Sequence, residues 1–183
     1  MKWESSGEFG NYILLMIEED NVDIVKQNAQ LNAKREASGE AKRKDLIFYS
    51  ISKPKLCVLK FISYLLEYNI VPVDDIEICK IYFLGLLHRL CNTTKFKLTN
   101  LNCHMTILTL LMITAKFLED EYLCNRGWAI SVGIKLSEIN NMEAILLELL
   151  DYNIFISKEQ LLHINKSIGL NKKHDTLVSI NIN

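Results

Sequence analysis

Glycine, proline and net charge are all scarce in this sequence. Its 183 residues include only 7 Gly and 2 Pro, while 49% of them are hydrophobic. Sandwiches and linker-rich chains need many turns, and collagen-like chains need regularly spaced glycine, so this composition argues against both. A single domain of this length with so few turn residues is expected to bury its many leucine and isoleucine side chains between helices. The composition therefore predicts an all-α fold.

The charges of the chain almost cancel. There are 21 Lys and Arg residues against 22 Asp and Glu residues, which leaves a formal net charge of -1. Such a balance produces no strong overall field that would draw in nucleic acid or an anionic membrane. We therefore do not expect a nucleic-acid partner.

Long apolar runs are also missing. The most apolar stretch, Met105 to Ala115, has about half of the ~20 residues that a membrane-spanning helix needs. The first residues, Met1 to Gly7, lack the apolar core of a signal peptide. An odd number of cysteines, 5 in all, is typical of reduced thiols rather than of a disulfide framework. We expect a protein of the nucleus and/or cytoplasm with no membrane partner.

From position 54 onward, apolar residues recur at three- and four-residue spacing, which predicts successive helices. The expected starts are Pro54 in the first turn of one helix, Asp74 and Asp75 at the next, Thr99 or Asn100 as the cap of the third, and Ser137 as the cap of the fifth. The third helix is hydrophobic nearly all round, which is typical of a helix surrounded by others. The helices are expected at residues 54–68, 74–91, 100–118, 125–132, 138–150 and from 158 onward.

We divide the chain into three parts. Residues 1–45 are an N-terminal extension, partly helical or flexible, because a polar, mixed-charge run follows two modest apolar patches. Residues 46–168 are the helical domain with its C-terminal helix, and residues 169–183 are a tail. The cluster Lys42-Arg43-Lys44 is either a nuclear localisation signal or a chance grouping of basic residues.

Two charged residues fall where the pattern is apolar. Glu143 lies within the apolar stripe of the fifth helix, four residues after Ile139 and three before Leu146. A carboxylate on a buried face needs a cation or several donors, because an unpaired buried charge is costly. Lys116 ends the apolar run of the third helix. One possibility is that its aliphatic chain packs against the core while its ammonium reaches water. The other is that it forms an ion pair with Glu143 on a surface that binds another protein.

Around Lys116 the sequence carries an ordered series of motifs that resembles the cyclin box. It is closest to the single-box P/U-type cyclins of phosphate signalling, and the resemblance covers roughly residues 52–165. The string from Leu98 to His104 also resembles the start of that family's third helix. The motifs are, in order, Thr114-Ala115-Lys116-Phe117-Leu118-Glu119-Asp120-Glu121-Tyr122, Asn125, Trp128-Ala129, Gly133-Ile134, Glu138-Ile139-Asn140, Met142-Glu143 and Leu150-Asp151-Tyr152.

The resemblance implies a fold and a function. The fold is an all-α single cyclin box of five helices around a central buried helix, with N-terminal and C-terminal helical extensions. The function is that of a regulatory subunit, which binds and activates a cyclin-dependent protein kinase by stabilising the active position of its regulatory helix. Such a chain is expected to be no enzyme, to use no cofactor and to be a monomer outside the kinase complex. P/U-type membership suggests phosphate signalling, and cell-cycle control is the alternative.

The resemblance also implies the kinase-binding residues. In cyclins, the lysine and glutamate that match Lys116 and Glu143 hold each other and contact the kinase backbone. Asp120 lies where a carboxylate would meet the arginines that otherwise bind a phosphothreonine, although an acidic turn is more often a solvated loop. Phe117 and Tyr122 either line the partner groove or belong to the core.

Two departures limit what the resemblance implies. Met105 stands where the family usually has an arginine after the histidine. The helix expected at residues 54–68 lacks the M-R-A-I-L string with which many cell-cycle cyclins dock substrates, so no docking site is predicted.

Three other interpretations have less support in the sequence. A cyclin-fold adaptor of transcription or nucleoprotein complexes would act without kinase activation. A nucleophilic enzyme would rest on Cys57, Cys79 or Cys124, and the chain has none of the usual catalytic motifs. A zinc site is disfavoured because no C-x-x-C is present. The residues it would use are His88, Cys91, Cys103 and His104.

Overall fold

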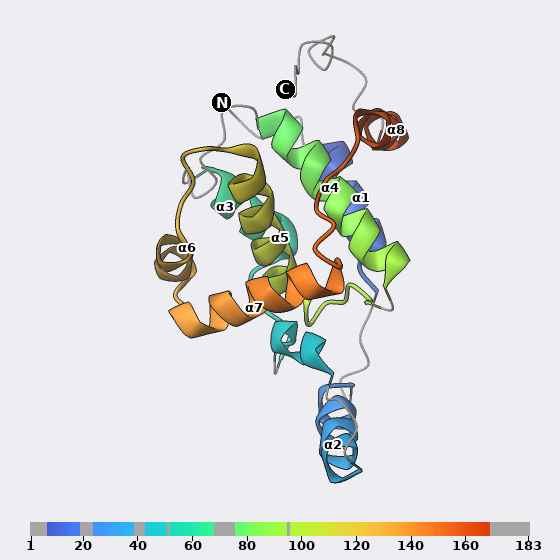
Figure 1. The fold of residues 1–183 in the computed structure, drawn as a ribbon, viewed down its shortest axis with the longest axis vertical. Coiled ribbons are helices and arrows are strands. Elements are labelled where there is room, and N and C mark those ends of the chain that lie inside the picture. The colour runs from blue at the N-terminus through green and yellow to red at the C-terminus, as the bar shows by residue number, and fades with distance from the viewer. Residues whose placement is uncertain are drawn as a thin grey trace.

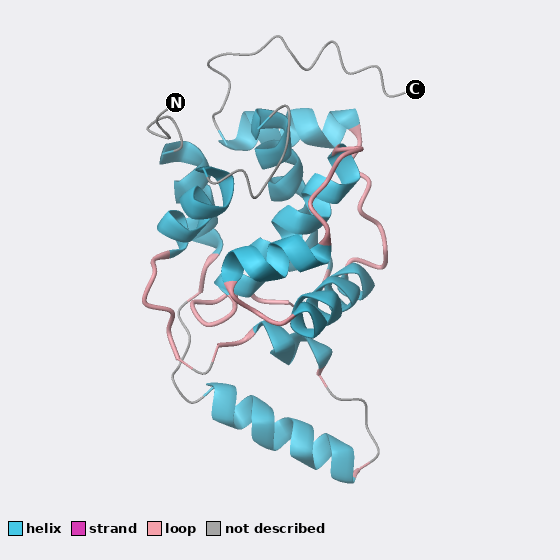
Figure 2. Ribbon diagram, turned by 90° about the vertical axis from the view of Figure 1, so that its left-hand side faces the viewer, coloured by secondary structure: helices cyan, strands magenta, loops and turns pink. Residues whose placement is uncertain are grey.

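A computed structural model shows a bundle of helices (Figures 1 and 2). It describes residues 7–18, 24–38, 43–50, 52–67, 76–94 and 96–168. Within these ranges there are eight α-helices, one short 3-10 helix and no strand, and an isolated bridge pairs Glu18 with Thr99. None of these helices is both long and apolar enough to cross a bilayer. The predicted all-α class is confirmed.

The elements follow one another along the chain with short connections. In order they are α1 (Gly7–Met16), α2 (Ile24–Ala37), the 3-10 helix η2 (Lys44–Phe48), α3 (Val58–Glu67), α4 (Ile76–Thr93), α5 (Cys103–Leu118), α6 (Asn125–Val132), α7 (Leu136–Leu149) and α8 (Lys158–Ile168).

Helix α5 is the centre of the molecule. Every residue from Thr106 to Ala115 is buried, and α3, α4 and α7 all pack against this helix, as Figure 1 shows. Thr109 and Thr114 fit this apolar setting because each hydroxyl donates to the carbonyl four residues earlier, at 2.7 and 2.8 Å. The five helices α3 to α7 thus form the predicted box around one buried helix.

Helix α1 belongs to the same core, although it lies in the N-terminal extension. Phe9 and Ile13 are 2% and 0% exposed, and the Phe9 ring lies 6.0 Å from that of Phe83 in α4. Helix α2, in contrast, stands apart at one end of the molecule in both views (Figures 1 and 2). The Asn32 side chain accepts a 3.0 Å hydrogen bond from the Arg43 backbone and so links α2 to the start of η2.

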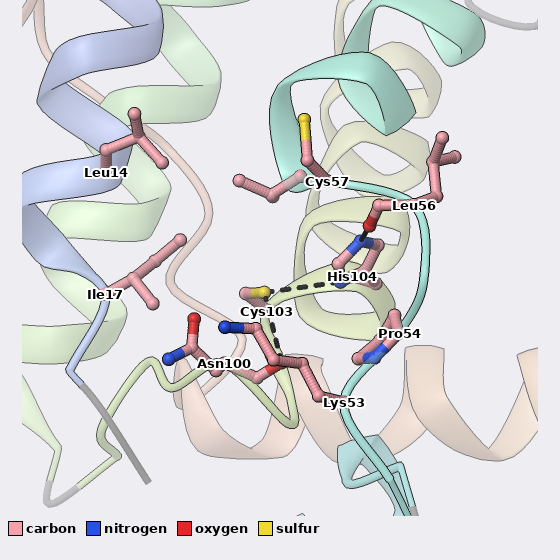
Figure 3. Close-up of a pocket in the computed structure, with 10 residues that line it drawn as sticks. Leu14, Ile17, Lys53, Pro54, Leu56, Cys57, Asn100, Cys103 and His104 are labelled. Carbon is pink, nitrogen blue, oxygen red and sulfur yellow. Dashed lines mark hydrogen bonds between the residues drawn. The ribbon is translucent and has the colours of Figure 1, made fainter.

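A pocket of about 300 Å³ lies between α1, the segment before α3 and the start of α5 (Figure 3). His104 links the start of α5 to the segment before α3, because its Nε2 donates to the Leu56 carbonyl at 2.8 Å. Its other ring nitrogen, Nδ1, lies 3.3 Å from the Cys103 thiol. Burial lowers the pKa of His104, so the ring stays neutral at physiological pH. The start of α3 is thereby held against α5.

Several predicted helix starts are wrong. Pro54 lies outside α3, which begins at Val58. The chain before this helix forms bends, and its Leu56 carbonyl is bonded to His104. Helix α5 begins at Cys103 rather than after Asn100. Its start is delayed by the buried Asn102, whose side chain accepts from the Thr99 N–H at 2.7 Å and donates to the Lys97 carbonyl at 2.8 Å.

Ser137 is not the cap of α7 either. The helix begins at Leu136, and the Glu138 carboxylate accepts the Lys135 backbone N–H at 3.2 Å. Three expectations lie outside the described residues: the start of a helix at Asp74 and Asp75, the complete Lys42 to Lys44 cluster, and the tail at 169–183.

Gly133 ends α6 and lets the chain turn back into α7. It has φ 71 and ψ 31, in the left-handed region, and its N–H reaches the Ala129 and Ile130 carbonyls. This geometry is typical of a glycine that terminates a helix. The position fixes how α6 and α7 meet, and both helices contribute to the site described below.

We predict that Gly133→Ala destabilises the protein by about 1 kcal/mol and Gly133→Asn by roughly half as much. No atom lies within 4 Å of a Cβ added at this position, so the cost is backbone strain alone. Urea unfolding followed by the fluorescence of the buried Trp128 measures both values. Equal stability of the alanine variant and the wild type would contradict this account of the turn.

Candidate functional site

The two charged residues that break the apolar pattern meet at one end of α5. Lys116 Nζ lies 2.6 Å from Glu143 Oε1, and the side chains are 22% and 19% exposed. Lys116 is in the last turn of α5, where the helix leaves the core, and Glu143 lies between the buried Met142 and Leu146 on α7. The structure thus brings together the two residues that were predicted to form a pair.

Asn125, the first residue of α6, completes this pair. Its Oδ1 accepts a hydrogen bond from Lys116 Nζ, and its Nδ2 donates to Glu143 Oε2 at 2.6 Å. The three side chains therefore close a ring, in which each is bonded to the other two. Asn125 Nδ2 also donates to Asn140 Oδ1 at 2.8 Å, at the solvent edge of the ring.

Neither asparagine was predicted to belong to the site. Asn125 belongs to the motifs that resemble the cyclin box, but an asparagine at a helix start is usually interpreted as a cap, so no binding role was assigned to it. Asn140 lies three residues before Glu143 on α7 and hence on the same helix face. That spacing and its place in the cyclin-box motif Glu138-Ile139-Asn140 were the sequence features that tied it to the pair.

The ring keeps bonding capacity for a partner. A lysine ammonium has three N–H donors, and Lys116 uses two of them within the ring. Each oxygen of Glu143 receives one bond and can accept another. The site can therefore donate to a carbonyl and accept from an N–H of another chain, with its own charges already compensated.

Exposed aromatic side chains border the ring. Phe117 is 42% exposed and Tyr122 is 51% exposed. The Lys116 ammonium lies 5.9 Å from the centre of the Tyr122 ring, within the range of a cation–π contact. Both aromatic side chains thus lie beside Lys116 and are open to solvent rather than buried in the core.

Tyr82 connects this surface to the loop after α7. Its ring stacks on Phe117, with centroids 5.2 Å apart and planes at 26°. Its hydroxyl donates to the Ile154 carbonyl at 2.9 Å and accepts from the Ile156 N–H at 3.0 Å. Burial raises the pKa of Tyr82, so the hydroxyl keeps the proton that it donates.

Tyr152 is a further aromatic residue on this loop. Aromatic side chains usually lie largely in the core, but Tyr152 is 69% exposed. The reason is the turn that ends α7: Asp151 and Tyr152 have φ of 52 and 54, a left-handed conformation that costs non-glycine residues energy. The turn directs the chain away from α7 before Ile154 meets Tyr82.

Asp120 makes no hydrogen bond or ion pair with the ring. It is exposed in the turn that follows α5. Its position leaves the carboxylate open to an external cation.

The residues weighed as metal ligands have other partners. His88 Nε2 lies 2.7 Å from the Asn92 side-chain nitrogen, and Cys103 and His104 bond to each other and to backbone. Burial raises the pKa of Cys91 to about 11. Among the residues that the structure describes, no three His, Cys, Asp or Glu side chains are grouped to hold a metal ion.

Comparison with known proteins identifies the fold that carries this ring. The family model for cyclins matches residues 14–154, which is most of the chain. The chain belongs to the cyclin family. This cyclin thus has its Lys116–Glu143 pair and its central α5 within the matched segment, which begins near the end of α1. Members of the family are regulatory rather than catalytic proteins.

Individual relatives are distant. Cyclin-U1-1 from Arabidopsis thaliana is 26% identical over 73% of this cyclin and 64% of its own length. Cyclin-U3-1 from the same plant is 27% identical over 62% and 49%, and PHO85 cyclin-7 from Saccharomyces cerevisiae is 26% identical over 63% and 44%. The matched segment therefore spans less than two thirds of each of these relatives. The predicted kinship with the P/U-type cyclins is confirmed.

We predict that Glu143→Ala lowers the free energy of unfolding by no more than about 2 kcal/mol, because Lys116 is partly exposed and can turn its ammonium to water. Thermal unfolding of the variant and the wild type measures this value. A loss as large as the 3–5 kcal/mol typical of a broken buried pair would assign the pair a mainly structural role.

Proposed function

We propose that this cyclin binds a cyclin-dependent protein kinase through the surface around Lys116 and Glu143 and activates it. The observation that carries the proposal is the ring of Lys116, Glu143 and Asn125, a compensated ion pair left partly exposed between exposed aromatic residues. An ion pair that is partly exposed to solvent adds little to the stability of the fold, so stability alone does not explain this pair.

The chemistry of the ring suits a protein backbone. A preformed ion pair has met part of its desolvation cost before a partner arrives. Its spare donor on Lys116 and spare acceptors on Glu143 can then bond a carbonyl and an N–H at the end of a partner helix, where such groups lack intrahelical partners. Phe117, Tyr122 and Tyr152 supply the aromatic contacts typical of interface hot spots.

Activation follows from selective binding. A kinase regulatory helix must lie inward for its glutamate to pair with the lysine that orients the ATP phosphates. A cyclin that binds only the inward position shifts the kinase towards its active state, by no more than the difference between its affinities for the two states. This cyclin would need no chemistry of its own for that effect.

The relatives suggest which kinase to test. Two of them are named after one kinase partner: PHO85 cyclin-7 of Saccharomyces cerevisiae and PHO85 cyclin-like protein psl1 of Schizosaccharomyces pombe, at 26% and 28% identity. We therefore propose a PHO85-type cyclin-dependent kinase and a role in phosphate signalling.

The partner is identified by affinity capture from the cells that make this cyclin, with mass spectrometry of the bound proteins and a protein-kinase assay of the eluate. A cyclin-dependent kinase whose activity needs the cyclin supports the proposal. Capture of transcription or nucleoprotein components without kinase, together with steeply salt-dependent DNA affinity, would favour the adaptor function instead.

Lys116→Ala and Glu143→Ala are each predicted to weaken kinase affinity by at least about tenfold, because each leaves the other charge uncompensated at the interface. Surface plasmon resonance with the captured kinase measures the dissociation constants of both variants. The matched control is Lys97→Ala, which breaks an ion pair with Glu18 at the opposite end of α5 and should leave affinity within about twofold. Unchanged affinity in both ring variants would remove Lys116 and Glu143 from the interface.

Asp120 is predicted to replace the phosphate of an activation-segment phosphothreonine by pairing with the arginines that would bind it. Asp120→Asn should then reduce the activity of the complex with unphosphorylated kinase by about tenfold and have a smaller effect once the kinase is phosphorylated. The exposed Glu121, one residue further along the same turn, offers the control Glu121→Gln. Full activity of the Asp120→Asn complex with unphosphorylated kinase would contradict this role.

A further inference from the structure

Asn125 holds the Lys116–Glu143 pair in a single arrangement through both ends of its side-chain amide. The oxygen accepts from Lys116, and the nitrogen donates to Glu143 Oε2 at 2.6 Å and to Asn140 Oδ1 at 2.8 Å. An amide nitrogen has two hydrogens, and each of them has one of these acceptors. No other rotation of the amide satisfies Lys116 and Glu143 together, so the ring fixes its orientation.

This fixed amide determines which bonds remain for a partner. With Glu143 Oε1 and Asn125 Oδ1 each holding one donor of Lys116, the third N–H can point in only one direction. Without Asn125, the ammonium could rotate and approach either oxygen of Glu143. The pair would persist, but its spare donor would no longer have a defined direction.

The location of Asn125 supports a role beyond capping α6. The N-cap position belongs to Cys124, and Asn125 is already the first helical residue, with its side chain turned away to α5 and α7. The amide therefore joins three helices at one point. Helices α5 and α7 supply the charges, and α6 supplies the neutral group between them.

We propose that Asn125 is a positioning residue for kinase binding, which orients the spare donor of Lys116 and the spare acceptors of Glu143, and that Asn140 supports it from the solvent edge. The proposal rests on the proposed function of the Lys116–Glu143 surface. It adds a neutral residue to the recognition site and explains why the pair needs a third member.

The first experiment tests the ring in the free cyclin, without any kinase. In NMR spectra, the side-chain amide hydrogens of Asn125 should exchange with solvent at least about tenfold more slowly than those of Asn141. The reason is that both amide hydrogens of Asn125 are hydrogen-bonded within the ring. Asn141 is the next residue after Asn140 on α7 and is exposed, which makes it a matched reference. Equal exchange rates would overturn the proposal even if the kinase were unknown.

The second experiment is a double-mutant cycle on kinase affinity. Asn125→Asp places a carboxylate against Glu143 in place of a donor, and should weaken binding by about tenfold or more. Glu143→Gln alone should also weaken binding, because Lys116 loses its counter-charge. In the double variant, one carboxylate and one amide again face Lys116, so binding should recover above that of either single variant.

The possible outcomes distinguish failure of the positioning role of Asn125 from failure of the proposed kinase binding. Additive losses in the double variant would show that Asn125 and Glu143 act independently and would overturn the positioning role. Loss of binding in Lys116→Ala together with wild-type affinity in Asn125→Asp would also reject it, while leaving the kinase-binding surface intact. If wild-type cyclin bound no cyclin-dependent kinase, the proposed function would fail, and the amide exchange rates would still decide whether the ring exists. Asn141→Ala is the control for substitution on α7 and should bind like the wild type.

Discussion

The burial of α5 on nearly all sides is the constraint on which the rest of the molecule depends. A helix with apolar residues all round must be surrounded, and α3, α4 and α7 supply its neighbours. A lysine is most easily accommodated where such a helix leaves the core, because its ammonium can reach water there. Lys116 lies at that point, in the last turn before Glu119. The place of the candidate site therefore follows from the packing of the central helix.

The ring at the end of α5 resolves a conflict between packing and charge. Glu143 occupies a position in the apolar stripe of α7, where an uncompensated carboxylate would be costly. Lys116 and Asn125 compensate it from two other helices, and all three remain partly open to solvent. A site that is charged, internally satisfied and bordered by exposed aromatic side chains is suited to binding another protein.

Periodicity was enough to predict the class of fold and the central helix. It also marked Lys116 and Glu143 as charges within an apolar pattern, whereas their pairing was implied by the resemblance to the cyclin box. Local hydrogen bonds were beyond such reasoning. The Leu56 carbonyl, which is bonded to His104, lies in the bends that separate Pro54 from α3, and the buried Asn102 delays the start of α5. Asn125 was missed since its role depends on how three helices meet.

The central claim is that the surface around Lys116 and Glu143 faces a kinase. Hydrogen–deuterium exchange of the cyclin with and without its kinase tests this claim most directly, because it needs no mutation. We expect slower backbone exchange at residues 116–125 and 140–155 in the complex, and unchanged exchange at residues 96–102, at the opposite end of α5. Protection of residues 96–102 with no change at the first two segments would contradict it.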